Sequence, residues 1–148
     1  MKWFARIFVF FGALIVGIFV SSLFAPAPVS VAGSRNVKGP LTAQNLLGTW
    51  TGSWGHDDGR CTLIIDRVDG NEFAGTLRKN GAAIRFEGTF DPSTRKFTFN
   101  ETKILTLGAE FDGWSLGKNN GIISPDGRIL VGDGQDEWGQ YGWAASNY

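Results

Sequence analysis

The fold of this chain is decided by the stretch Leu46-Leu-Gly-Thr-Trp-Thr-Gly-Ser-Trp-Gly55. Residues two apart share one face of a strand, so Trp50, Gly52 and Trp54 face one side and the small polar residues between them face the other. A large residue followed two positions later by glycine recurs in Phe73-Ala-Gly75, Phe86-Glu-Gly88 and Leu130-Val-Gly132. Large and small side chains alternate in this way along the inward faces of small closed β-barrels.

Turn signals divide the rest of the chain into short strands. The sequence predicts eight strands. The first ends at residue 54, and the other seven lie at 60–68, 72–79, 82–90, 95–103, 112–123, 128–132 and 141–145. Asn80-Gly81 is the strongest break, because a two-residue type I′ turn needs positive φ at both positions. Residues 104–111 fit either a bulged continuation of a strand or a looser connection, and a bulge is predicted at 119–121.

Consecutive hairpins of this kind predict an antiparallel meander. Eight such strands close readily into an all-β, up-and-down barrel, and a two-sheet β-sandwich is the alternative architecture. The segment Leu41–Leu47 is predicted to form one helical turn that plugs an end of the barrel, with Thr42 as its cap.

The N-terminus has the pattern of an export signal. Lys2 and Arg6 precede an apolar run from Ile7 to Phe24, and basic residues before such a run stay on the cytoplasmic side. Small residues in Ser30-Val-Ala32 fit a signal-peptidase site, while the length of the run also fits a retained anchor. We therefore expect a signal peptide or membrane anchor at 1–32, a linker at 33–40 and a β-barrel domain at 41–148.

This organisation predicts an extracytoplasmic domain. It would be periplasmic or secreted, or tethered to the outer face of the cytoplasmic membrane, with residues 7–24 as its one membrane contact if they are not cleaved. All 14 acidic residues of the chain lie after Leu41, against 10 of its 14 basic residues. A domain with this acidic excess lacks the basic footprint of a nucleic-acid-binding protein, so no nucleic-acid partner is expected.

Cysteine and histidine usage narrows the chemistry further. Cys61 is the only cysteine, so an intrachain disulfide is excluded, and its register with Leu63 and Ile65 indicates a buried thiol. His56 is the only histidine, which excludes a closed zinc site built from cysteine and histidine. The glycines lie in predicted strands and hairpins rather than in a phosphate-binding loop. No cofactor, metal or catalytic nucleophile is predicted.

Glu101 is the main candidate among the ionisable residues. It shares the strand face of Phe97 and Phe99, so strict alternation points its carboxylate into the barrel. One interpretation makes it a ligand-binding or proton-transferring acid with a raised pKa. The other places it at the barrel rim, hydrogen-bonded to a loop or paired with Arg85 or Lys103.

Aromatic and acidic residues near the C-terminus supply the remaining candidates. Trp138 lies in an acidic segment beside glycine and is predicted to be exposed, and flat rings beside polar groups suit stacking on a flat neutral ligand. The acidic segment 133–137 fits a solvated turn or a calcium loop, and the tryptophans fit a purely structural role. The predicted ligand-binding residues are Glu101, Trp114, Trp138, Asp133 and Asp136.

Two segments resemble known small barrels. Leu46-Leu-Gly-Thr-Trp50 resembles the Gly-x-Trp entry of lipocalins and avidins and the opening of the haem-binding nitrobindins, and 69–77 resembles the second hairpin of avidins. The resemblance implies a calycin-like barrel. The chain departs from avidins in lacking alignable biotin-contacting tryptophans, and from nitrobindins in lacking a late histidine for haem. The segments 101–103, 114–117 and 136–143 resemble an uncharacterised bacterial module.

Three classes of function fit these observations. The first, which we favour, is a non-enzymatic binding module of the cell envelope that takes a small apolar molecule or a glycan at the barrel mouth. The second is a structural or protein-interaction domain with a filled barrel. The third is a carboxylate-dependent envelope hydrolase using Glu101 with Asp112 or Asp133, which requires a separation of about 5–9 Å between the two acids.

Overall fold

The computed structural model describes residues 39–109 and 113–148. The predicted signal or anchor at 1–32, its apolar run at 7–24 and all of the predicted linker except Gly39 and Pro40 lie outside the described residues, as does Asp112. Within the described ranges, no helix combines the length and apolar character needed to cross a membrane.

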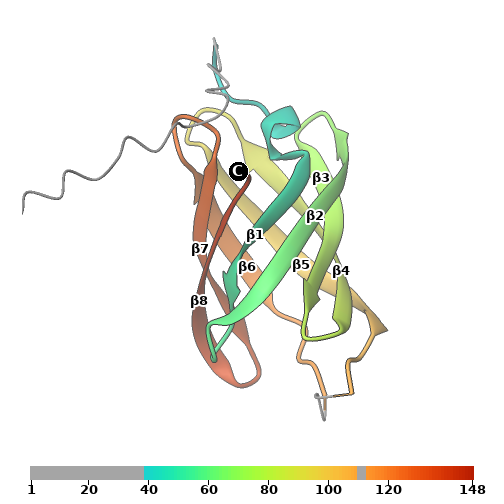
Figure 1. The fold of residues 1–148 in the computed structure, drawn as a ribbon. Helices are drawn as coiled ribbons and strands as arrows, with labels where there is room; N and C mark the ends of the chain where they lie inside the picture. The colour runs from blue at the N-terminus through green and yellow to red at the C-terminus, as the bar shows by residue number, and fades with distance from the viewer. Residues whose placement is uncertain (1–38, 110–112) are drawn as a thin grey trace, which may run out of the picture. The chain divides into compact units, whose positions relative to one another are not determined.

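The described chain is a closed barrel of eight antiparallel strands in sequence order (Figure 1). The strands are β1 Gly48–Trp54, β2 Gly59–Asp69, β3 Glu72–Lys79, β4 Ala82–Asp91, β5 Lys96–Thr106, β6 Lys118–Ile123, β7 Ile129–Asp136 and β8 Gly139–Ser146. Pairing of β1 with β8, from Thr51 opposite Ser146 to Trp54 opposite Trp143, closes the sheet on itself. The predicted up-and-down barrel is confirmed, and the alternative sandwich is wrong.

The turns follow the chemistry that the sequence predicted. Asn80 and Gly81, between β3 and β4, both have positive φ, at 47° and 82°, as a type I′ turn requires. Between β4 and β5, the Asp91 carboxylate accepts hydrogen bonds from Ser93 and Thr94, which hold its pKa at about 2. Residues 104–106 continue β5, so this part of the unassigned segment belongs to a strand.

Three strand predictions need correction. The sixth strand, predicted at 112–123, begins at Lys118, so residues 113–117 belong to the connection between β5 and β6. The bulge predicted at 119–121 is wrong, because β6 keeps an unbroken register with β5 and β7. Side chains of β6 alternate regularly, and Asn119, Gly121 and Ile123 face the interior. The register of the barrel shifts instead within the β2–β3 pair and the β4–β5 pair. β7 also extends to Asp136, so the predicted acidic turn after Gly132 is part of a longer hairpin.

A short 3-10 helix, η1 (Ala43–Leu46), covers the end of the barrel at which β1 begins (Figure 1). Thr42 is its N-cap residue, and the Thr42 amide donates to the Asn45 side chain at 2.8 Å. Leu46 is fully buried, and its carbonyl accepts a hydrogen bond of 2.7 Å from Nε1 of Trp50. The predicted helical plug is therefore present, and Trp50 anchors it.

Aromatic rings fill the interior by packing over glycines of neighbouring strands. Phe73 lies opposite Gly88 and Phe86 opposite Gly75 in the β3–β4 pair. A Cβ added to Gly88 would meet the Phe73 ring at 2.7 Å, and one added to Gly75 would meet the Phe86 ring at 2.5 Å. The same relation joins Phe97 to Gly121, Trp143 to Gly132 and Tyr141 to Gly134.

Cys61 belongs to this interior, as its register predicted. The residue is 2% exposed, and burial raises the pKa of its thiol to about 11. A thiol with this pKa is protonated at neutral pH and therefore a poor nucleophile.

Replacing Trp50 by alanine is expected to destabilise the barrel by about 3–5 kcal/mol, because a fully buried ring and its hydrogen bond to η1 are lost. The matched variant Trp138→Ala removes a ring that is 60% exposed and should change stability little. Urea unfolding of both variants measures the difference. Equal losses of stability would contradict the assignment of one ring to the core and the other to the surface.

Replacing Gly88 by alanine is expected to cost about 1–3 kcal/mol, since the new methyl group would collide with the Thr98 carbonyl oxygen and with the side chains of Phe73 and Phe99. Gly142→Ala is the control, because a Cβ there meets nothing within 4 Å. The check is the denaturation midpoint of each variant. If Gly88→Ala were as stable as Gly142→Ala, tight packing of rings over glycines would not hold the core.

Candidate functional site

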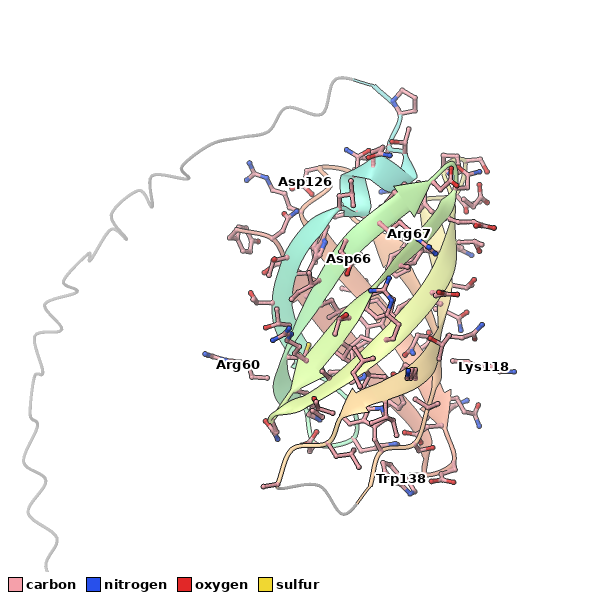
Figure 2. The ribbon with its side chains drawn as sticks, turned by 90° about the vertical axis from the view of Figure 1, so that its right-hand side faces the viewer. Arg60, Asp66, Arg67, Lys118, Asp126 and Trp138 are labelled. Atoms are coloured by element: carbon pink, nitrogen blue, oxygen red, sulfur yellow. The ribbon has the colours of Figure 1, made fainter. Side chains whose placement is uncertain are left out.

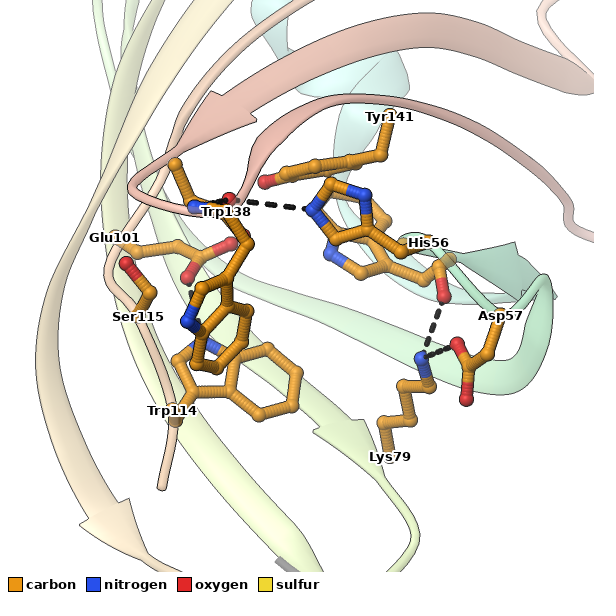
Figure 3. Close-up of a pocket in the computed structure, with 11 residues that line it drawn as sticks. His56, Asp57, Lys79, Glu101, Trp114, Ser115, Trp138 and Tyr141 are labelled. Atoms are coloured by element: carbon orange, nitrogen blue, oxygen red, sulfur yellow. Dashed lines mark hydrogen bonds and ion pairs between the residues drawn. The ribbon is translucent and has the colours of Figure 1, made fainter. Parts of the chain in front are cut away.

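A pocket of about 160 Å³ opens at the end of the barrel opposite η1. Four connections meet at this end: the turns after β1, β3 and β7 and the longer connection from β5 to β6. Figure 2 shows Trp138, in the turn after β7, at the opposite end of the barrel from Asp126. The pocket is lined by the rings of Trp54, His56, Trp114, Trp138 and Tyr141 and by the ionisable side chains of Asp57, Lys79, Glu101 and Asp136 (Figure 3).

The carboxylate of Glu101 is held inside the barrel wall by three donors. Its Oε2 accepts hydrogen bonds from Nε1 of Trp114 at 2.7 Å and from the Gly117 amide at 3.2 Å. Its Oε1 accepts from Nδ2 of Asn119 at 3.4 Å, and Oδ1 of Asn119 in turn accepts from the Tyr141 hydroxyl at 3.0 Å. Glu101 thus fixes one tryptophan of the pocket and, through Asn119, is linked to its tyrosine.

Burial governs the ionisation of this network. Glu101 is 6% exposed, and desolvation raises the pKa of its carboxyl group, although the three hydrogen bonds oppose the shift. The nearby charge of Asp136 raises the pKa of Glu101 further. Desolvation and the charge of Glu101 raise the pKa of the Tyr141 hydroxyl, which therefore stays protonated at neutral pH. A positive charge that entered the pocket would oppose this rise in the pKa of Glu101, and a negative charge would increase it.

Lys79 and Asp57 form an ion pair on another side of the pocket. The Lys79 ammonium donates to the carbonyl of Trp54 at 2.7 Å and to the Asp57 carboxylate. The hydrogen bond from Lys79 is the main reason that the pKa of Asp57 is lowered. Lys79 is 7% exposed, so its charge is neutralised locally and joins the first turn to the end of β3.

His56 and Asp136 form a second polar pair. Nε2 of His56 lies 3.2 Å from Oδ1 of Asp136, and the same oxygen accepts a hydrogen bond from the Trp138 amide at 2.8 Å. The His56 ring also packs edge-on against Tyr141, with ring centroids 5.2 Å apart. Oγ of Ser115 accepts from the Glu137 amide at 3.2 Å, which ties the β5–β6 connection to the last turn. These contacts set the position of Trp138 although its ring is exposed.

Trp54 separates the pocket from the aromatic interior. The ring is 2% exposed and stacks on Trp143 with centroids 4.9 Å apart. Its centroid lies 6.0 Å from that of Tyr141, which also lines the pocket. The pocket is therefore shallow, since a ligand that enters meets Trp54 rather than a channel through the barrel.

Four of the five sequence-predicted site residues line this pocket: Glu101, Trp114, Asp136 and Trp138. Asp133 does not, because β7 continues through it and alternation turns its side chain outward, where it accepts a hydrogen bond from Asn120. Glu101 is hydrogen-bonded to the β5–β6 connection, as one interpretation held. It is not paired with Arg85, which binds Asp66 on the outer surface.

Sequence reasoning missed Lys79, Tyr141 and Asn119 as members of the site. Alternation contained the signal for Lys79, which continues the inward set of Phe73, Gly75 and Leu77 on β3. The predicted bulge at 119–121 hid the inward position of Asn119. The placement of His56 depends on its turn, where no periodic pattern applies.

Comparison with known proteins identifies no family for the chain: no family model matches it, and neither a curated protein nor a solved structure gives a match.

Proposed function

We propose that this protein is an extracytoplasmic, non-enzymatic binding module that holds a small molecule in the pocket at the end of its barrel. The observation that carries the proposal is the combination of exposed and buried rings with a buried, hydrogen-bonded carboxylate around one pocket. A small-molecule site typically has this composition, with an apolar and aromatic lining and a few fixed polar groups.

The pocket favours this function over a purely structural barrel. A ring that stabilises the fold by packing is buried. Trp138 is 60% exposed at the pocket mouth, so packing of the core does not account for it. Its backbone is held by Asp136, and the β5–β6 connection is tied to the same turn through Ser115. An exposed ring whose backbone is already held in place is preorganised, and preorganisation of this kind strengthens the binding of a ligand.

The arrangement of acids favours binding over hydrolysis. A glycosidase of the usual kind needs one acid that delivers a proton and a second that acts as a base or nucleophile. Glu101 accepts three hydrogen bonds from the protein, and Oδ1 of Asp136 already contacts both His56 and the Trp138 amide. Asp133, one of the predicted partners of Glu101, faces outward. Fixed acids of this kind suit recognition.

Binding should depend on Glu101 and Trp138. We expect Glu101→Gln and Trp138→Ala to keep the fold and to weaken binding roughly 10- to 100-fold, because a charged hydrogen-bonding group or a stacking ring is lost. Asp133→Asn is the matched control, since that side chain lies outside the pocket. The measurement is calorimetric titration of a ligand selected by a thermal-shift screen of envelope glycans, lipophilic metabolites and small amines.

A different result would overturn the proposal. If no compound of the screen stabilised the wild-type protein, or if Asp133→Asn weakened binding as much as Glu101→Gln, the pocket would not be the binding site. The structural or interaction domain would then become the better account.

The location is a separate prediction. Lys2 and Arg6 before the apolar run at 7–24 should direct the barrel out of the cytoplasm. A reporter that works only outside the cytoplasm, fused after Tyr148, should be active. Replacing part of the apolar run by charged residues should abolish the signal. Activity of a cytoplasm-only reporter at the same position would contradict the prediction.

A further inference from the structure

We infer that the ligand of this pocket is an organic cation whose positive charge is carried by a compact, methylated ammonium group. This inference rests on the proposed function, since it names the chemical class that the same pocket accepts. Four features of the pocket lead to it: the charges of its lining, the rings that surround it, the hydrogen bonds already made by its acids and its volume.

The charges of the lining favour a cation. Asp57 and Lys79 neutralise each other through their direct contact. The remaining ionisable acids are Glu101, which is 6% exposed, and Asp136, whose side chain is 7% exposed. Two carboxyl groups that line one pocket and are little exposed to water favour a ligand that brings positive charge into it. An anionic ligand would be repelled by both acids. The ammonium of Lys79 would compensate little, because it already donates hydrogen bonds to the Trp54 carbonyl and the Asp57 carboxylate.

The rings favour a cation for a second reason. Aromatic faces carry a negative quadrupole, which attracts a cation placed within about 6 Å of the ring centroid. In Figure 3 the rings of Trp114 and Trp138 are seen on one side of the pocket and those of His56 and Tyr141 on the other. With Trp54 they form an aromatic enclosure that opens beside the carboxylate of Glu101.

The hydrogen bonds specify which kind of ammonium fits. Glu101 already accepts from Trp114, Gly117 and Asn119, and Oδ1 of Asp136 accepts from the Trp138 amide. A primary ammonium needs acceptors for its three N–H groups, and Glu101 has about one of the four lone-pair sites of a carboxylate left to offer. A tetraalkylammonium has no N–H group, so charge and ring contacts are sufficient to hold it.

The volume sets the size of the group. A cavity of about 150 Å³ in another protein is known to hold benzene, which has six non-hydrogen atoms. The present pocket, at about 160 Å³, therefore accommodates a trimethylammonium group and the first carbon of its chain. A hexose has twice as many non-hydrogen atoms and would remain partly outside.

The test compares two probes of the same shape. Choline and its neutral carbon analogue 3,3-dimethylbutan-1-ol differ in the charge of one central atom, and calorimetric titration of the full chain measures both. We expect choline to bind about tenfold more tightly or better, as the desolvated cation–ring contacts imply. Tetramethylammonium should also bind more tightly than methylammonium.

Variants assign the effect to the pocket. Glu101→Gln and Trp138→Ala should each reduce the preference for choline over its analogue, and Asp133→Asn should leave it unchanged. Circular dichroism and melting curves establish that each variant is folded.

The outcomes separate this inference from the proposed function. Equal binding of the neutral analogue, or tighter binding of a glycan or methylammonium, would overturn the cation inference and leave the binding module intact. Failure of every probe and every screened compound to bind would overturn both.

Discussion

Five large rings inside this barrel pack over a glycine on the neighbouring strand, and that packing shapes the rest of the structure; the rings are those of Phe73, Phe86, Phe97, Tyr141 and Trp143. In the β3–β4 pair, Phe73 of β3 lies opposite Gly88 of β4, and Phe86 of β4 lies opposite Gly75 of β3. Each ring occupies the space that a side chain on the opposite residue would fill. Gly121, Gly132 and Gly134 make the same space on β6 and β7. Eight strands enclose too little room for rings on every inward position, so the glycines make the closed barrel feasible.

This packing also determines where a ligand can bind. Trp50 and η1 close one end, and the stacked rings of Trp54 and Trp143 mark the limit of the interior toward the other. The inward positions beyond Trp54 carry Lys79, Glu101 and Asp136 in place of apolar residues. Unlike the phenylalanine rings of the core, these groups need hydrogen-bonding partners, and the connections at this end supply most of them. A polar, ring-lined pocket above a filled interior is the result.

Strand alternation and turn chemistry made the barrel predictable from the sequence, including the inward direction of Glu101 and the exposure of Trp138. Alternation continued through β7 to Asp136 predicts that Asp133 faces outward and Asp136 inward, because the strand contains both residues. Alternation was not extended to these residues because the acidic segment 133–137, which contains a glycine, has the composition of a turn. The partners of Glu101 depend on the path of the β5–β6 connection, and the contact between His56 and Asp136 joins residues 80 positions apart. Such contacts arise only when the barrel closes.

The central claim is that Glu101 is a buried carboxyl group whose charge is linked to the contents of the pocket. Isotope-edited NMR of the Glu101 side-chain carboxyl carbon, measured against pH, tests it directly. The account predicts a pKa above the ordinary value for glutamate in the empty protein, with the Trp114 indole N–H signal moving in the same titration, because the two groups are 2.7 Å apart. Choline should then lower that pKa while Asp136 and Tyr141 stay in place beside it. An ordinary pKa, with no response of the Trp114 signal and no effect of choline, would contradict the account.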